Sequence, residues 1–187
     1  MHSFDAPQDV LLPPHLVSRA RAYATEVHAT LDYADSNQRS RKVRGDHHSG
    51  KLGEEAVRLV YASFGVPVEG PDYTIYTGRR KSWEADLTVD GAALHVKTQT
   101  SRASLLYGLS WLFQDSSARS DTALKQLEEW VCFVLLDEEK LRARVFPPQQ
   151  MKSLKFSEPA LAHLQGKKRV AYAREQRWFE SEWVALP

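Results

Sequence analysis

The stretch Trp83–Thr100, WEADLTVDGAALHVKTQT, contains the pattern that decides the fold. Its Asp90-Gly91 pair predicts a two-residue hairpin turn, because both residues tolerate the positive φ that a type I′ turn requires. Counting outward from this turn gives three cross-strand pairs: Val89 with Ala92, Asp86 with His95, and Glu84 with Lys97.

Alternation of side chains along the two strands predicts one apolar and one polar face. The apolar face, which must be buried, consists of Ala85, Leu87, Val89, Ala92, Leu94 and Val96. The polar face gathers carboxylates, an imidazole and an ammonium group: Glu84, Asp86, Thr88, His95, Lys97 and Gln99. Cross-strand neighbours lie about 5 Å apart, so these groups can form a metal site. A half-exposed hairpin with a solvated, charged outer face, or a network of ion pairs, is the alternative.

The composition predicts a single globular domain in the cytoplasm. A chain of 187 residues, 42% hydrophobic and 26% charged, is long enough for one core and too short for two comfortable domains. The single cysteine, Cys132, excludes an intramolecular disulfide. We see no apolar stretch of membrane-spanning length and no signal peptide at the N-terminus, so no membrane partner is expected.

Local basic stretches are the candidate contacts for nucleic acid, because the net charge of +1 leaves no global excess of Lys and Arg. The polar stretch 36–51 and the loop 78–81 contain basic residues next to the proposed site: Arg39, Arg41, Lys42, Arg44, Lys51, Arg79, Arg80 and Lys81. Such residues contact phosphates well. A solvated linker and an ordinary charged surface loop are the alternatives.

Periodicity predicts the remaining elements. Helices are expected over 15–35, 52–64 and 120–130, and strands over 73–76, 131–137, 142–146 and 169–173. The segments 1–14 and 101–117 are expected to be irregular, and 149–154 and 159–164 to be short helices. Glu54 and Glu55 fall in the first turn of the 52–64 helix, where the helix dipole alone would explain an acidic pair.

This order of elements and residues resembles the PD-(D/E)XK nuclease superfamily, over about residues 49–137. The glutamate from the helix matches Glu54, with Glu55 as the alternative if the helix is rotated. The aspartate matches Asp86, and the (D/E)-x-K tripeptide matches His95-Val96-Lys97, with a polar Gln99 two residues on. His95 departs from the family, which usually has Asp or Glu there.

The resemblance implies an α/β fold with a restriction-endonuclease-like core, a central mixed β-sheet flanked by helices on both sides. The N-terminal helix and basic loop would occupy 1–48, the catalytic core 49–137, and strands and short helices 138–187. It also implies Mg²⁺ or Mn²⁺ bound by Glu54, Asp86 and His95, with Lys97 holding the attacking water or the phosphate. His95 can be a ligand, a group that orients a ligand, or a general base.

The function implied is hydrolysis of phosphodiester bonds by a metal-dependent DNA endonuclease of the type II restriction or phage-defence kind. By analogy with the family, the partner is duplex DNA and the protein is a homodimer. Two alternatives stay open. One is a DNA-binding module on a nuclease fold that has lost catalysis through His95, and the other is a junction-specific or RNA nuclease.

Overall fold

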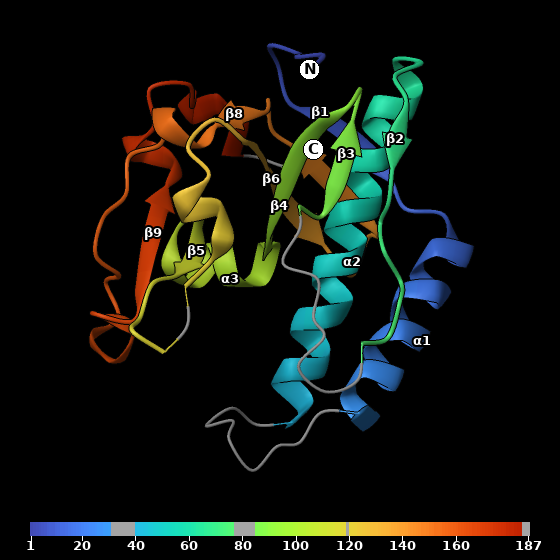
Figure 1. Cartoon of the computed structure of the whole chain (residues 1–187), viewed down its shortest axis with the longest axis horizontal. Helices are drawn as coiled ribbons and strands as arrows, with labels where there is room; N and C mark the ends of the chain where they lie inside the picture. Colours follow the sequence, from blue (N-terminus) through green and yellow to red (C-terminus); the bar gives the residue numbers. More distant parts are fainter. Residues whose placement is uncertain (31–39, 77–84, 119, 185–187) are drawn as a thin grey trace.

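A mixed seven-stranded sheet forms the centre of the computed structural model, which describes residues 1–30, 40–76, 85–118 and 120–184 (Figure 1). The strand order is β1-β7-β6-β4-β3-β2, and β8 also pairs with β6. The strands are β1 (Gln8–Leu11), β2 (Val68–Glu69), β3 (Leu87–Val89), β4 (Ala92–Thr100), β6 (Trp130–Asp137), β7 (Arg142–Val145) and β8 (Gln149–Gln150). The α/β class and the mixed sheet are as predicted, because β4 and β6 are parallel whereas the other paired strands are antiparallel.

The predicted hairpin has the predicted register. Val89 pairs with Ala92 and Leu87 with Leu94, and the turn residues Asp90 and Gly91 have φ of 48° and 75°. The ladder ends there, so the expected pairing of Asp86 with His95 is wrong: Asp86 lies in a bend just before β3. The expected partner of Lys97, Glu84, lies outside the described residues.

Two long helices, α1 (Pro14–Thr30) and α2 (Ser40–Ser63), pack together and cover one face of the sheet (Figure 1). The buried residues of α2 on this side share a core with Leu87, Leu94 and Val134, and they are Leu52, Ala56, Val57, Val60 and Tyr61. Burial of such side chains contributes about 1.5–3 kcal/mol each, so this layer fixes α2 firmly on the sheet.

The polar stretch before Leu52 is helical from Ser40, where a loop was predicted. Polar contacts outside the apolar stripe hold these extra turns. His47 lies edge-on to Tyr23 of α1, and Ser49 donates a hydrogen bond to Glu138 after β6 (2.8 Å). Such contacts between distant segments leave no periodicity in the sequence.

The opposite face of the sheet carries an antiparallel ribbon of β5 (Ser110–Gln114) and β9 (Lys168–Tyr172), with the short helix α3 (Ser101–Tyr107) beside it (Figure 1). An aromatic core lies between ribbon and sheet, and includes Trp111, Phe113, Phe133, Phe146 and Trp178. The prediction of helices on both faces is therefore only partly met, since a β-ribbon provides much of the second layer.

Several local predictions are wrong. Residues 8–11 and 110–114 are strands and 101–107 a helix, where irregular chain was expected. The segment 73–76 lies outside the strands, and the expected helix over 120–130 is a 3₁₀ turn at Thr122–Lys125. The expected short helices near 149–164 are 3₁₀ turns at Met151–Ser153 and Ala162–Leu164. Further 3₁₀ turns occupy Ala173–Glu175 and Ser181–Val184.

Among the described residues, no helix combines the length and apolar character needed to cross a membrane.

Candidate functional site

Gly53 sets the distance between α2 and the sheet. A Cβ atom at this position would lie 1.8 Å from the Oγ1 atom of Thr98 in β4, so only glycine permits so close an approach. The next residue, Glu54, is therefore held at the level of β4 and is only 8% exposed. A glycine in the middle of α2 thus positions the central carboxylate.

Glu54 is paired with a lysine on its own helix. Lys51 Nζ donates a hydrogen bond to Glu54 Oε2 at 2.5 Å, and the two side chains are 11% and 10% exposed. Their spacing of three residues puts them on one helix face. Lys51 was predicted as a DNA contact, but its ammonium group is committed to Glu54.

Asp86 is the second carboxylate near Glu54. Burial first, and the negative charge of Asp86 second, raise the pKa of Glu54 to about 8, although Lys51 opposes this shift. Asp86 itself is oriented by the backbone, since the Val96 amide donates to its Oδ2 at 2.7 Å. Two carboxylates from distant parts of the chain therefore share one partly buried location, which favours a proton or a bound cation there.

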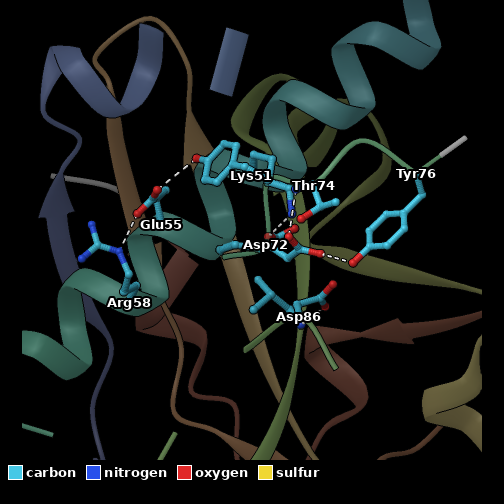
Figure 2. Close-up of polar contacts among 10 residues, drawn as sticks. Lys51, Glu55, Arg58, Asp72, Thr74, Tyr76 and Asp86 are labelled. Atoms are coloured by element: carbon cyan, nitrogen blue, oxygen red, sulfur yellow. Dashed lines mark hydrogen bonds and ion pairs between the residues drawn. The ribbon is translucent and has the colours of Figure 1, made fainter. Parts of the chain in front are cut away.

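Glu55 turns away from this pair. It is fully buried, accepts from Arg58 Nε (2.6 Å) and from the Tyr73 hydroxyl (3.0 Å), and so joins α2 to the 71–76 segment. Figure 2 shows Glu55 directed to Arg58, while Lys51, Asp72 and Asp86 lie on the other side. Of the two alternatives that the sequence left open, Glu54 is thus the residue beside Asp86.

Asp72 is a nearby acidic residue that sequence reasoning missed. It is exposed, and it accepts from the Thr74 amide (2.8 Å) and the Tyr76 hydroxyl (2.6 Å) (Figure 2). The bond to Thr74 is the Asx-turn type, which the order Asp-x-Thr after a proline could have indicated. The charge of Lys51 reaches Asp72 as well as Glu54.

The side chains of His95 and Lys97, from the predicted tripeptide, project from the face of β4 that is opposite to α2. They stand beside Val131 and Phe133 of β6, which belong to the aromatic core under the ribbon. His95 Nε2 lies 2.6 Å from Glu129, and Lys97 Nζ lies 2.9 Å from Asp121.

Packing and hydrogen bonds hold this second group in place. The Lys97 ammonium also lies 4.7 Å from the centroid of the Phe113 ring. Gln99, further along the same face, donates to Gly108 O (3.1 Å) and accepts from the Ser110 amide (3.0 Å). These contacts tie β4 to the start of β5.

The structure therefore separates the predicted site residues into two groups. Glu54, Asp86 and Lys51 form one group, which we call the α2-side cluster; His95, Lys97 and Gln99 form the other, the ribbon-side group. Within the described ranges, neither His95 nor Lys97 forms a hydrogen bond or ion pair with Glu54 or Asp86.

Some of the predicted DNA contacts lie on the first turns of α2, and others lie outside the described residues. Lys42 pairs with Asp46 (2.6 Å) and is 62% exposed, and Arg44 is exposed on the same helical turns. These turns of α2 lie beside the C-terminal turns of α1, beyond the sheet (Figure 1). The structure does not describe Arg39, Arg79, Arg80 and Lys81, or the side chain of Arg41.

The donors of the α2-side cluster fit a hard divalent cation. Mg²⁺ is commonly held by one or two carboxylates, with water and substrate phosphate completing its shell. Glu54 and Asp86 provide such a pair, and burial, followed by the charge of Asp86, raises the pKa of Glu54. His95 lies on the ribbon side, and the described residues contain no group of three or more His, Cys, Asp or Glu arranged to hold a metal.

Comparison with known proteins assigns no family. No protein-family model, no curated protein and no solved structure matches the chain. The function must therefore be argued from the site itself.

Proposed function

We propose that the protein is a metal-dependent DNA endonuclease whose metal site is built by Glu54 and Asp86. The observation that carries this proposal is the placement of Glu54, which is only 8% exposed at the contact between α2 and β4 and lies within reach of the Asp86 charge. Burial of an acid close to a second, half-buried acid is costly unless a cation or a proton compensates the charge, so this placement supports a cation site. The parallel β4–β6 pair and the α2 layer also support a restriction-endonuclease-like core.

A bound Mg²⁺ or Mn²⁺ would lower the pKa of a water molecule and neutralise charge on the phosphate. The chain supplies the orientation. The Val96 amide fixes Asp86, and Gly53 brings Glu54 close to β4. The bond between Glu55 and Tyr73 holds α2 to the 71–76 segment, and the bond between Glu55 and Arg58 fixes the Glu55 side chain on the helix.

Duplex DNA is the proposed substrate, with restriction or phage defence as the biological use, a cytoplasmic location and a symmetric homodimer. Support for the substrate comes from the basic turns of α2, where Lys42 and Arg44 are exposed. Cations on one exposed helix suit contact with a phosphate backbone. A junction-specific or RNA nuclease would use the same carboxylates and differ only in substrate.

A DNA-binding module without catalysis is the second candidate, and a specific observation favours it. The tripeptide residues are engaged with acids of their own, His95 with Glu129 and Lys97 with Asp121. The aspartate takes up part of the charge and one of the three donors of the Lys97 ammonium, which makes this lysine a poorer ligand for a water or a phosphate.

Cleavage of plasmid and phage-genome DNA tests the proposal, with the purified protein in Mg²⁺, Mn²⁺ and EDTA. We expect fragments that depend on the metal and that are lost in Asp86→Asn. The matched control is Asp121→Asn, which removes an aspartate on the ribbon side. Binding of DNA without cleavage in either metal would instead identify the non-catalytic module, and branched or RNA substrates cut in preference would identify the other nuclease class.

A further inference from the structure

Lys51 stands out because, among the described residues, it is the cation paired with Glu54, one of the two proposed metal carboxylates. Its Nζ is 2.5 Å from Glu54 Oε2, and both side chains are almost completely removed from solvent. Charges so placed interact more strongly than surface pairs, because water screens them less. An ammonium group thus already occupies the carboxyl oxygen that a divalent cation would need.

We propose that Lys51 is a positioning residue of this site, whose ammonium occupies the place on Glu54 that a divalent cation takes, so that the two compete for the carboxylate. This inference rests on the proposed metal site. It gives the lysine of the site to a helix residue three positions before Glu54, with a role different from the one that the resemblance implied for Lys97 on β4, which was to hold the attacking water or the phosphate.

The surroundings give the lysine a second location when it leaves Glu54. Its Nζ lies 5.1 Å from the Tyr23 ring centroid and 5.6 Å from the Tyr73 ring centroid. Both distances are within the range of about 6 Å over which an aromatic ring attracts a cation. Asp72, on the same side, is exposed and close enough for the Lys51 charge to act on it. The ammonium can therefore move within the site without losing every partner.

Lys97 offers an internal comparison. It is also a lysine bound to a carboxylate and next to an aromatic ring, at 2.9 Å from Asp121 and 4.7 Å from the Phe113 centroid. Lys97 differs from Lys51 in its location, because it lies on the ribbon side of the sheet and Lys51 lies on the α2 side. Its removal should therefore leave the Glu54 carboxylate untouched.

The test is Mn²⁺ binding by the full chain without DNA, measured by the electron paramagnetic resonance signal of free Mn²⁺. The variants are Lys51→Met, Lys51→Arg and Lys97→Met. We expect Lys51→Met to bind Mn²⁺ at least about tenfold more tightly than the wild type, because a unit positive charge a few ångströms away is removed. Lys51→Arg and Lys97→Met should stay within about twofold of the wild type, since the first keeps the competing charge and the second lies on the other face.

A double variant separates competition at Glu54 from a general change in structure. If Lys51 acts through Glu54, Lys51→Met should bring no gain in a Glu54→Gln background, as a double-mutant cycle would reveal. Circular dichroism and thermal unfolding establish that each variant is folded.

Each outcome is informative. Wild-type binding with equal or weaker binding by Lys51→Met overturns the role of Lys51 and leaves the proposed metal site intact. A tenfold gain in Lys97→Met instead would place the competing lysine on the ribbon side. Failure of every variant, Lys51→Met included, to bind Mn²⁺ would overturn the metal site and this inference together.

Discussion

The α2-side cluster and the ribbon-side group are built from the same kinds of residue, but they differ in what holds their charges. In the first, Glu54 has two charged neighbours of opposite sign, Lys51 and Asp86, and a pKa raised to about 8. In the second, His95 and Lys97 each have an acid of their own, Glu129 and Asp121. Two acids that share one lysine leave an excess of negative charge that favours binding of a cation, whereas each cation of the second group has an acid of its own. This difference between the two described groups is the reason for proposing the metal site at the first.

The largest expected difference between the two regions is catalytic. Glu54→Gln should reduce metal-dependent DNA cleavage at least about 100-fold, because loss of one group that stabilises transition-state charge commonly costs 10²–10³ in rate. Glu129→Gln, which removes the acid bound to His95, should reduce it less than about threefold. Initial rates on one plasmid substrate provide the measurement. Equal losses in the two variants would mean that both faces contribute to the reaction.

The next prediction concerns the close contact that creates the α2-side cluster. Gly53→Ala should destabilise the fold by about 3 kcal/mol, since the new Cβ meets Thr98 in a well-packed layer. The matched variant Gly50→Ala has no atom within 4 Å of its new Cβ, and it should stabilise α2 by up to about 1 kcal/mol. Urea unfolding measures both. A tolerated Gly53→Ala would contradict the close approach of α2 to β4.

Stability should also depend on pH through Glu54. Its pKa of about 8 lies above the unfolded value of about 4.3, so its favourable contribution is complete below the unfolded pKa and is lost as the pH rises toward 8. Glu54→Gln should remove this loss. We therefore compare the unfolding free energies of the variant and the wild type in EDTA. The variant's advantage over the wild type should be at least about 1 kcal/mol larger at pH 8 than at pH 5. Parallel pH profiles for the two proteins would contradict the shifted pKa.

The smallest effect is expected on the ribbon side. Lys97→Met breaks a pair whose side chains are 22% and 25% exposed, so it should cost about 0.5–1 kcal/mol of stability. The same urea titration measures it, with Lys152→Met as the control, because that lysine belongs to a far more exposed pair with Glu128. A loss of 3 kcal/mol or more would show that the ribbon-side pairs are central to the fold.

The sequence predicted the hairpin well because its information is local. Asp90-Gly91 fixes the turn, and alternation then fixes Leu87 opposite Leu94. The same alternation could not place Asp86, since the ladder stops one residue before it and its side chain binds the Val96 amide instead. The prediction of a single site with Asp86 and Lys97 on the same face therefore applied the strand alternation to a residue that lies outside the strand.

Other parts of the site depend on contacts between distant segments. Gly45 and Gly50 lower the helix signal of the first turns of α2, which are held instead by contacts to Tyr23 and Glu138. Strand β5 was missed because Leu112, between the buried Trp111 and Phe113, is an exposed apolar residue that hides the alternation. Glu54 could be named from the sequence, but its partnership with Lys51 rather than Lys97 could not.

The most direct test of a metal site on the α2 side is a crystal structure of the protein with Mn²⁺, in which anomalous scattering locates the ion. We predict an anomalous peak in contact with Glu54 and Asp86, with the Lys51 ammonium displaced from the Glu54 carboxylate. A peak against His95 and Glu129 on the ribbon side would contradict the assignment of the site. Crystals without any bound Mn²⁺ at saturating concentration would contradict metal dependence itself.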